Sequence, residues 1–98
     1  MSRKRLGQIR DKIRLREYDM SAHATEQMAE DDLDILDVEQ AVLNGQISRI
    51  EKDDPRGTKY VIEGTGMDQM TPVGVVGRFT GADRFLIITV YEATEPER

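Results

Sequence analysis

The fold is decided by residues 73–91, VGVVGRFTGADRFLIITVY. Two runs of β-branched and aromatic residues, Val73 to Phe79 and Phe85 to Tyr91, flank a turn at residues 81–84. Such runs predict strands, and the short turn predicts that they pair antiparallel. Because apolar residues occupy both alternating positions of the second run, we expect that strand to be covered on both faces and to lie at the centre of the sheet.

Two further strands are predicted earlier in the chain, from Gln46 to Glu51 and from Lys59 to Glu63. Residues 53–57, DDPRG, have the composition of a turn between them. A longer connection at residues 64–71 contains two Gly and two Met, and is the segment that we expect to be mobile. The second half of the chain is therefore predicted to form a four-stranded antiparallel sheet.

The first half has helical periodicity. Leu6, Ile9 and Ile13 recur at the spacing of one helix face and predict a first helix over residues 3–15. Ser21 can accept a free amide proton at a helix start, so a second helix is predicted from there to about residue 30.

The third predicted helix is the best-marked element. Asp34 as cap and Asp37 at the third position favour a helix start, and Asn44-Gly45 is the predicted left-handed stop. The fold class is thus α+β, with two to three N-terminal helices packed on the four-stranded antiparallel sheet.

A chain of 98 residues fits one domain, which we expect to span residues 1–98 with a core at about 3–91. Residues 92–98, which contain Pro96, are predicted to be a disordered tail. The chain contains no Cys, and its longest apolar run, residues 85–91, is too short to span a bilayer. These features favour a cytoplasmic protein that binds no membrane. The carboxylate cluster of Asp31, Asp32, Asp34 and Asp37 lacks the glycine and the terminal Glu of a calcium loop, so no metal or other cofactor is expected.

The net charge of -5 is unevenly distributed. Residues 1–20 carry seven Lys or Arg against three acids, whereas residues 21–54 carry two against ten. Nucleic acids favour cationic surfaces, so a sequence pI near 4.8 argues against a dedicated non-specific nucleic-acid binder. A local basic patch remains compatible with RNA binding.

His23, the one histidine, falls in the first turn of the second predicted helix. The helix dipole there favours a neutral imidazole, which can act as a base, and Glu26 and Gln27 are spaced to orient it. The alternative is a structural histidine that bonds to the backbone.

Polar and cationic groups also lie on the predicted strands. Lys59, Arg78 and Tyr91, together with Tyr60 and Thr89, are side chains that can hold a phosphodiester or stabilise the charge that develops during its cleavage. Strand alternation directs Lys59 and Tyr60 to opposite faces, so only some of these groups can share one groove. The alternative is that Tyr91 packs at the rim of the core and Arg78 is solvated.

The order and spacing of several short segments carry a family resemblance. They are Ser21-Ala22-His23-Ala24, Met28, Leu33, Asp37-Val38, Ala41, Gly45, residues 60–64 and Ile88-Thr89-Val90-Tyr91. Over about residues 13–91 the chain resembles the bacterial family named domain of unknown function 4258, whose members look like RelE- and MqsR-type toxins of toxin–antitoxin pairs.

The resemblance implies a RelE-like fold and a metal-independent endoribonuclease that acts on RNA or on the ribosome and is paired with an antitoxin protein. In such an enzyme His23 would be the base or its orienter, Lys59 and Arg78 would hold phosphate, and Tyr91 would bond the reacting nucleotide. The family usually has Arg at positions 27 and 31 and often His at position 74, where this chain has Gln27, Asp31 and Gly74.

These departures remove two cations and an imidazole, and leave a second hypothesis open. The same fold can act as a non-catalytic interaction module that binds another protein, or a second copy of itself, through the sheet edge or the acidic helices.

Overall fold

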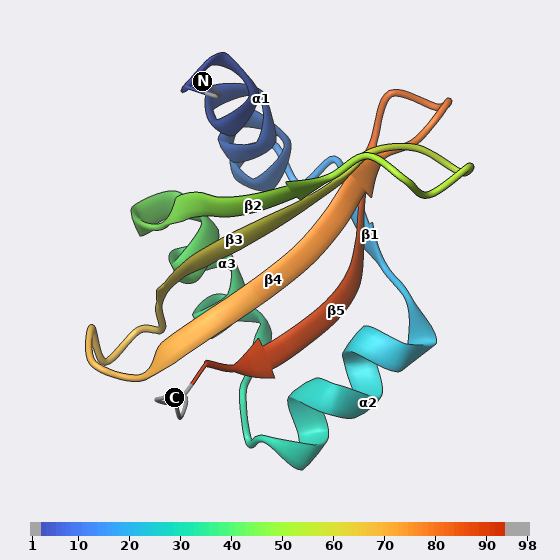
Figure 1. The fold of residues 1–98 in the computed structure, drawn as a ribbon. Helices are drawn as coiled ribbons and strands as arrows, with labels where there is room; N and C mark the ends of the chain where they lie inside the picture. The colour runs from blue at the N-terminus through green and yellow to red at the C-terminus, as the bar shows by residue number, and fades with distance from the viewer. Residues whose placement is uncertain (1–2, 94–98) are drawn as a thin grey trace.

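The computed structural model describes residues 3–93. The elements follow in the order α1 (Arg3–Arg14), β1 (Tyr18–Met20), α2 (Ala22–Glu30), α3 (Ile35–Asn44), β2 (Gln46–Glu51), β3 (Lys59–Thr65), β4 (Pro72–Phe79) and β5 (Phe85–Glu92) (Figure 1). The α+β class and the three helices are confirmed. Within the described residues no helix is long and apolar enough to cross a membrane.

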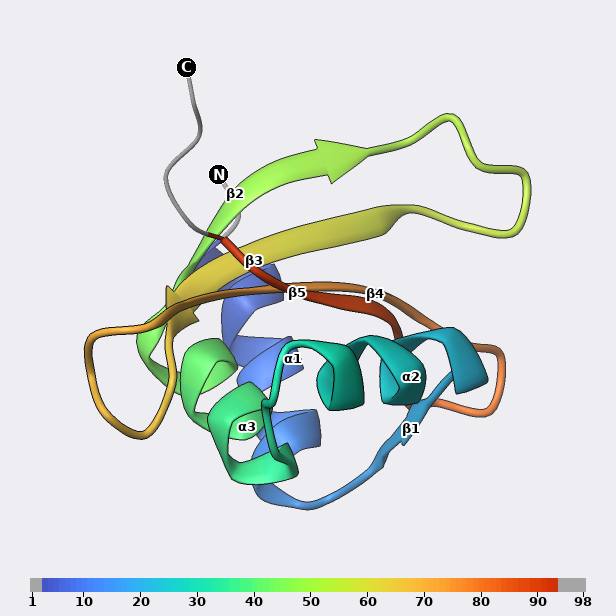
Figure 2. The same cartoon turned by 90° about the horizontal axis from the view of Figure 1, so that it is seen from below.

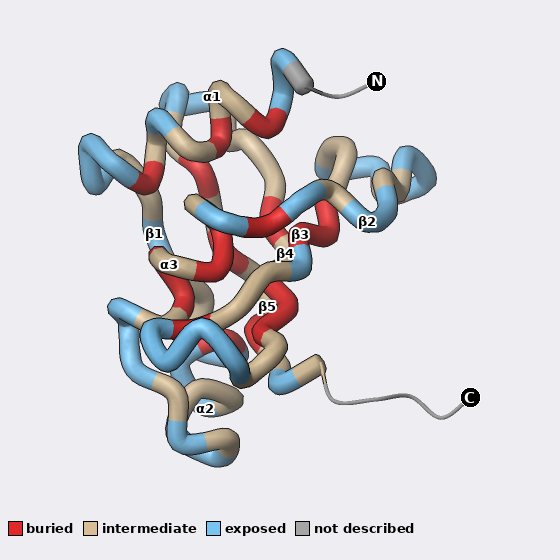
Figure 3. Tube along the Cα trace, turned by 90° about the vertical axis from the view of Figure 1, so that its left-hand side faces the viewer, coloured by how far each residue is buried: buried red, intermediate tan, exposed pale blue. Residues whose placement is uncertain are grey.

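Two layers make up the molecule. The sheet has the strand order β1-β5-β4-β3-β2, and all three helices lie on one side of it (Figure 2). Buried residues gather where the two layers meet (Figure 3). The other side of the sheet, which we call the open face, is not covered by any helix in the described part of the chain.

The prediction of four antiparallel strands is wrong, because the sheet has five strands and is mixed. β1 pairs parallel to β5, with Tyr18 opposite Phe85 and Met20 opposite Ile87. Three residues that include a charge, Tyr-Asp-Met, are too short a run to show a strand period, so only the long-range pairing reveals this strand. β4 is therefore central, whereas the sequence predicted β5 there.

Strand register separates the core from the open face. Ile62 pairs with Val75 and Val75 with Val90, and all three are fully buried under the helices. The alternate positions point to the open face: Gln46, Arg49 and Glu51 of β2, Lys59, Val61, Glu63 and Thr65 of β3, Gly74, Val76 and Arg78 of β4, and Leu86, Thr89 and Tyr91 of β5.

The first helix packs its apolar side chains into the core as predicted, and it also makes a polar contact with α3. Leu6, Ile9 and Ile13 are buried. Arg10 reaches the end of α3, where its Nη2 donates to the Gly45 carbonyl at 2.8 Å. A guanidinium on the last carbonyls of a helix satisfies acceptors that have no partner within that helix, so α1 caps α3.

The predicted left-handed stop at Gly45 is wrong, because its φ is −91° and the chain enters β2 directly. A glycine is needed there for space. A Cβ at this position would lie 2.4 Å from the Ala41 carbonyl oxygen and 2.5 Å from that of Glu63. The residue thus allows α3 to cross close above β3.

The starts of α2 and α3 are confirmed. Ser21 accepts from the Ala24 amide at 3.0 Å and also donates to the Ile88 carbonyl at 2.8 Å, which ties α2 to β5. Asp34 and Asp37 form a reciprocal capping box.

The predicted start of the tail at Glu92 is wrong. Glu92 belongs to β5, and its amide donates to the Asp31 carboxylate at 3.1 Å, while the Ala93 amide donates to Pro72 at 2.9 Å. The rest of the predicted tail, residues 94–98, lies outside the described residues.

Candidate functional site

Three of the four predicted site residues lie on the open face, with Lys59 and Arg78 near the β2–β3 turn and Tyr91 four β4 positions away, which is about 13 Å at roughly 3.3 Å per residue. Lys59 on β3, Arg78 on β4 and Tyr91 on β5 share this face by strand register. They come from three adjacent strands, whereas the predicted site also included His23. Tyr60, by contrast, is buried in the core and packs edge-to-face on Phe79, so strand alternation separates it from Lys59.

His23 is not part of this assembly. It is exposed on α2, a helix that contacts β5 on the helical side of the sheet. Among the described residues its imidazole makes no hydrogen bond. Strands β5 and β4 lie between α2 and Lys59, which is roughly 10 Å of sheet at about 4.8 Å per strand.

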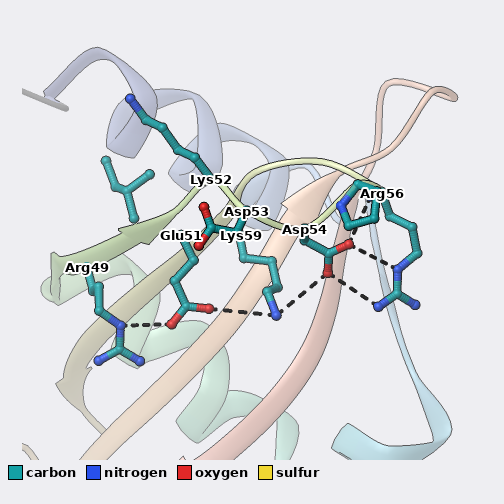
Figure 4. A pocket seen from close by; sticks show the side chains of 9 residues that line it. Arg49, Glu51, Lys52, Asp53, Asp54, Arg56 and Lys59 are labelled. Carbon is teal, nitrogen blue, oxygen red and sulfur yellow. Dashed lines mark hydrogen bonds and ion pairs between the residues drawn. The ribbon is translucent and has the colours of Figure 1, made fainter.

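A row of alternating charges runs along the β2–β3 hairpin, beside a shallow hollow of about 770 Å³ (Figure 4). Glu51 accepts from Arg49 Nε at 2.8 Å and lies 3.7 Å from Lys59 Nζ. Asp54 lies 3.7 Å from Lys59 Nζ and 3.2 Å from Arg56 Nε. Lys59 therefore stands between two carboxylates.

The carboxylate of Asp54 pairs with two cations of this row, Arg56 and Lys59. The Arg56 backbone amide, and then its guanidinium, lower the pKa of Asp54 to about 2. The carboxylate is thus ionised under all physiological conditions. An incoming phosphate would have to compete with it for Lys59, whereas Arg49 and Arg56 at the two ends are largely exposed.

Arg78 lies next to the hairpin. The Arg78 side chain lies beside Gly57 of the hairpin, because a Cβ on that glycine would be 3.9 Å from Arg78 Cδ. Its Nε is buried and has no hydrogen-bond partner among the described residues. A cationic donor without a partner is an unusual feature that a bound anion nearby would compensate electrostatically.

Tyr91 lies over a glycine of the neighbouring strand. Gly74 is its cross-strand partner, and a Cβ there would lie 2.1 Å from the ring carbon Cζ, so the ring covers the glycine. The hydroxyl donates to Glu63 Oε2 at 3.1 Å. Partial burial, and then this hydrogen bond, raise the pKa of Tyr91.

Three of the four aspartates around the start of α3, namely Asp31, Asp34 and Asp37, have structural roles. Asp34 and Asp37 bond backbone amides at the start of α3, and Asp37 Oδ1 also accepts from the Met67 amide at 2.9 Å. Asp31 holds the end of β5. No group of three or more residues suited to a metal is found among the described residues.

Sequence reasoning missed Arg49, Asp54, Arg56 and Glu63. Strand alternation places Glu63 on the face of Lys59, so that residue could have been found. The contact between Glu63 and Tyr91 could not, because a β-bulge between Val76 and Gly77 shifts the register of β4 against β5.

A family model described as "Domain of unknown function (DUF4258)" matches residues 20–92. The chain belongs to the DUF4258 family. The matched part of this DUF4258 protein includes His23 and the whole open face, and leaves α1 outside. No match was found among curated proteins or among solved structures.

Proposed function

We propose that this DUF4258 protein is an RNA-binding protein of the RelE/MqsR toxin type that receives single-stranded RNA on the open face of its sheet. The observation that carries the proposal is the gathering of Arg49, Lys59, Arg78 and Tyr91 on that face. Residues 17–48, which form much of the helical side, contain no Lys or Arg and nine acids. RNA would be repelled by the part of the helical side that α2 and α3 form, whereas α1 on the same side carries six Lys or Arg.

Tyr91 provides an aromatic ring on which a base can stack. Its ring covers Gly74, and the part of the ring that stays exposed on the open face is available to a nucleobase. An aromatic ring on an uncovered sheet stacks on bases with little dependence on sequence. Arg49, and further along the strands Lys59 and Arg78, would hold phosphates on the side of Tyr91 that faces the β2–β3 turn.

Cleavage without a metal is the finer part of the proposal, with Glu63 as the base in place of His23. The exposed Glu63 carboxylate lies beside Tyr91, where a bound ribose would stand. It would take the proton from the 2′-hydroxyl, the 2′-oxygen would attack the adjacent phosphorus, and the 5′-oxygen would leave with a proton from water. Arg49, whose charge acts on Tyr91, would stabilise the extra negative charge.

Binding is tested by fluorescence polarisation with a labelled unstructured RNA at two salt concentrations. Arg78→Ala and Tyr91→Ala should each weaken binding by about tenfold, and Arg78→Ala should lower the salt dependence by about one counterion. Arg14→Ala removes an exposed cation from α1 and should change binding little. Equal effects of Arg14→Ala and Arg78→Ala would contradict the proposed face.

Cleavage is tested by expressing the protein without its genomic neighbour. We expect growth arrest and RNA degradation that Glu63→Gln abolishes and His23→Ala leaves intact. Arrest that survives Glu63→Gln but not His23→Ala would restore the histidine as the base.

The second candidate function is a non-catalytic interaction module, and the pairing of Lys59 with Glu51 and Asp54 favours it. A cation that is already neutralised by the hairpin contributes little to RNA affinity. A stable protein complex or homodimer, without RNA binding at micromolar protein, would establish this alternative.

A further inference from the structure

The described residues contain five exposed large apolar side chains, and four of them come from two neighbouring segments. Ile35 and Leu36, in the first turn of α3, are 38% and 46% exposed. Met67 and Met70, in the loop between β3 and β4, are 55% and 79% exposed. We call these four side chains the apolar ridge.

The two segments are joined directly. Asp37, the next residue of α3, accepts from the Met67 amide at 2.9 Å, and Asn44 at the far end of the helix makes three hydrogen bonds to Thr65. Figure 2 shows the β3–β4 loop beside α3. The ridge is therefore one surface formed by a helix start and a loop.

The loop, predicted to be mobile, is internally hydrogen-bonded. Asp68 accepts from the Met70 amide at 2.9 Å, from the Thr71 amide at 2.8 Å and from the Thr71 hydroxyl at 2.6 Å. The Gly66 amide donates to the Thr71 carbonyl at 3.0 Å. A segment that is already ordered loses little conformational entropy on binding, so the two Met side chains are presented ready for a partner.

A polar hollow of about 430 Å³ lies beside the ridge, between α3 and the same loop. It is lined by Gln40, Asn44, Gly64, Thr65 and Gln69. Amide side chains next to an apolar surface are suited to hydrogen bonds with a partner's backbone.

The charge around the ridge identifies the partner's chemistry. The ridge is built from two stretches, residues 17–48 and 60–77, that contain no Lys or Arg. Asp32 and Asp34 adjoin it on the helix side and Asp68 on the loop side, and all three are exposed. An occupant must therefore combine apolar side chains with positive charge.

We infer that the apolar ridge is a docking surface for a basic amphipathic segment of a partner protein. Apolar side chains of the partner cover Leu36, Met67 and Met70, while its Lys or Arg side chains face the surrounding acids. This surface lies at the end of the sheet near α3 and does not depend on RNA binding by the open face. Both functions can therefore operate in one molecule.

The probe is a synthetic amphipathic helix of Leu and Lys, titrated into isotopically labelled full-length protein. We expect NMR shift changes confined to residues 32–37 and 64–71. The double variant Met67→Ser/Met70→Ser should weaken binding by about tenfold, as expected when two central apolar contacts are lost. Leu15→Ser, which removes the fifth exposed apolar side chain, should leave the affinity unchanged.

Two outcomes would overturn the inference. One is equal affinity for the matched peptide of Leu and Glu, which would show that charge does not select the partner. The other is binding that the double Met variant leaves unchanged, which would place the peptide elsewhere on the acidic surface.

Discussion

Two glycines are required by close contacts that cannot be read from the sequence. Gly45 looks like a helix stop, but the structure requires it because two backbone carbonyl oxygens occupy the space of a Cβ. Gly74 likewise gives its space to the Tyr91 ring. Composition and periodicity carry no information about either contact, since both depend on how α3 and β5 cross their neighbours.

The first prediction concerns this crowding. Gly45→Ala should destabilise the protein by about 1–3 kcal/mol, because the obstructing atoms belong to the backbone and can move only with α3 or β3. Gly7→Ala is the matched control: no atom lies within 4 Å of its added Cβ, and alanine in a helix should stabilise by up to about 1 kcal/mol. Urea unfolding of both variants measures the difference, and equal free energies of unfolding would contradict the packing.

A second prediction at this scale compares two tyrosines. The hydroxyl of Tyr18 donates to Glu39, which is 9% exposed, and burial followed by this bond raises the pKa of Tyr18 well above its usual value. Tyr18→Phe should cost about 1–3 kcal/mol because it removes a partner from a buried carboxylate. Tyr91→Phe removes the corresponding bond from the exposed Glu63 and should cost below about 0.5 kcal/mol. Thermal unfolding that ranks the two in the opposite order would refute the assignment.

Among the elements, those with a local signature were predictable and those defined by distant partners were not. The Ser21 cap and the Asp34–Asp37 capping box lie within a few residues of one another, so their chemistry is visible in the sequence. β1 has no such local signature, and it forms a strand because it pairs with the edge of β5. The site shows the same difference. Strand alternation can be read from the sequence and assigns Lys59 and Arg78 to a face, whereas the contact of Glu63 with Tyr91 depends on the register between β3, β4 and β5.

The β3–β4 loop gives the prediction at this scale. The Thr71 hydroxyl, and then the Thr71 and Met70 amides, lower the pKa of Asp68 to about 2. Because the ordinary Asp value is about 3.9, the stabilisation by Asp68 is complete above about pH 4 and is lost as the pH falls through about 2. A carboxyl titration by NMR should place the midpoint near 2 in the wild type and higher in Thr71→Val. A midpoint near the ordinary value in both proteins would show that the loop is not held in this way.

At the scale of the whole molecule, the two sides of the sheet have different chemistry. The helical side contains the acidic stretch of residues 17–48, which holds α2 and α3, and the apolar ridge adjoins α3. The open face carries Tyr91 and several cations, although the net charge of the chain is -5. A protein with a low pI can thus present a local surface for RNA, because binding depends on the charges that a ligand meets.

The most direct measurement is an NMR titration of the labelled protein with an unstructured RNA. RNA binding on the open face predicts the largest shift changes at Arg49, Lys59, Glu63, Arg78 and Tyr91, with residues 22–44 nearly unaffected. Changes centred on His23 and α2, or none at saturating RNA, would contradict the assignment of the open face as the RNA-binding surface.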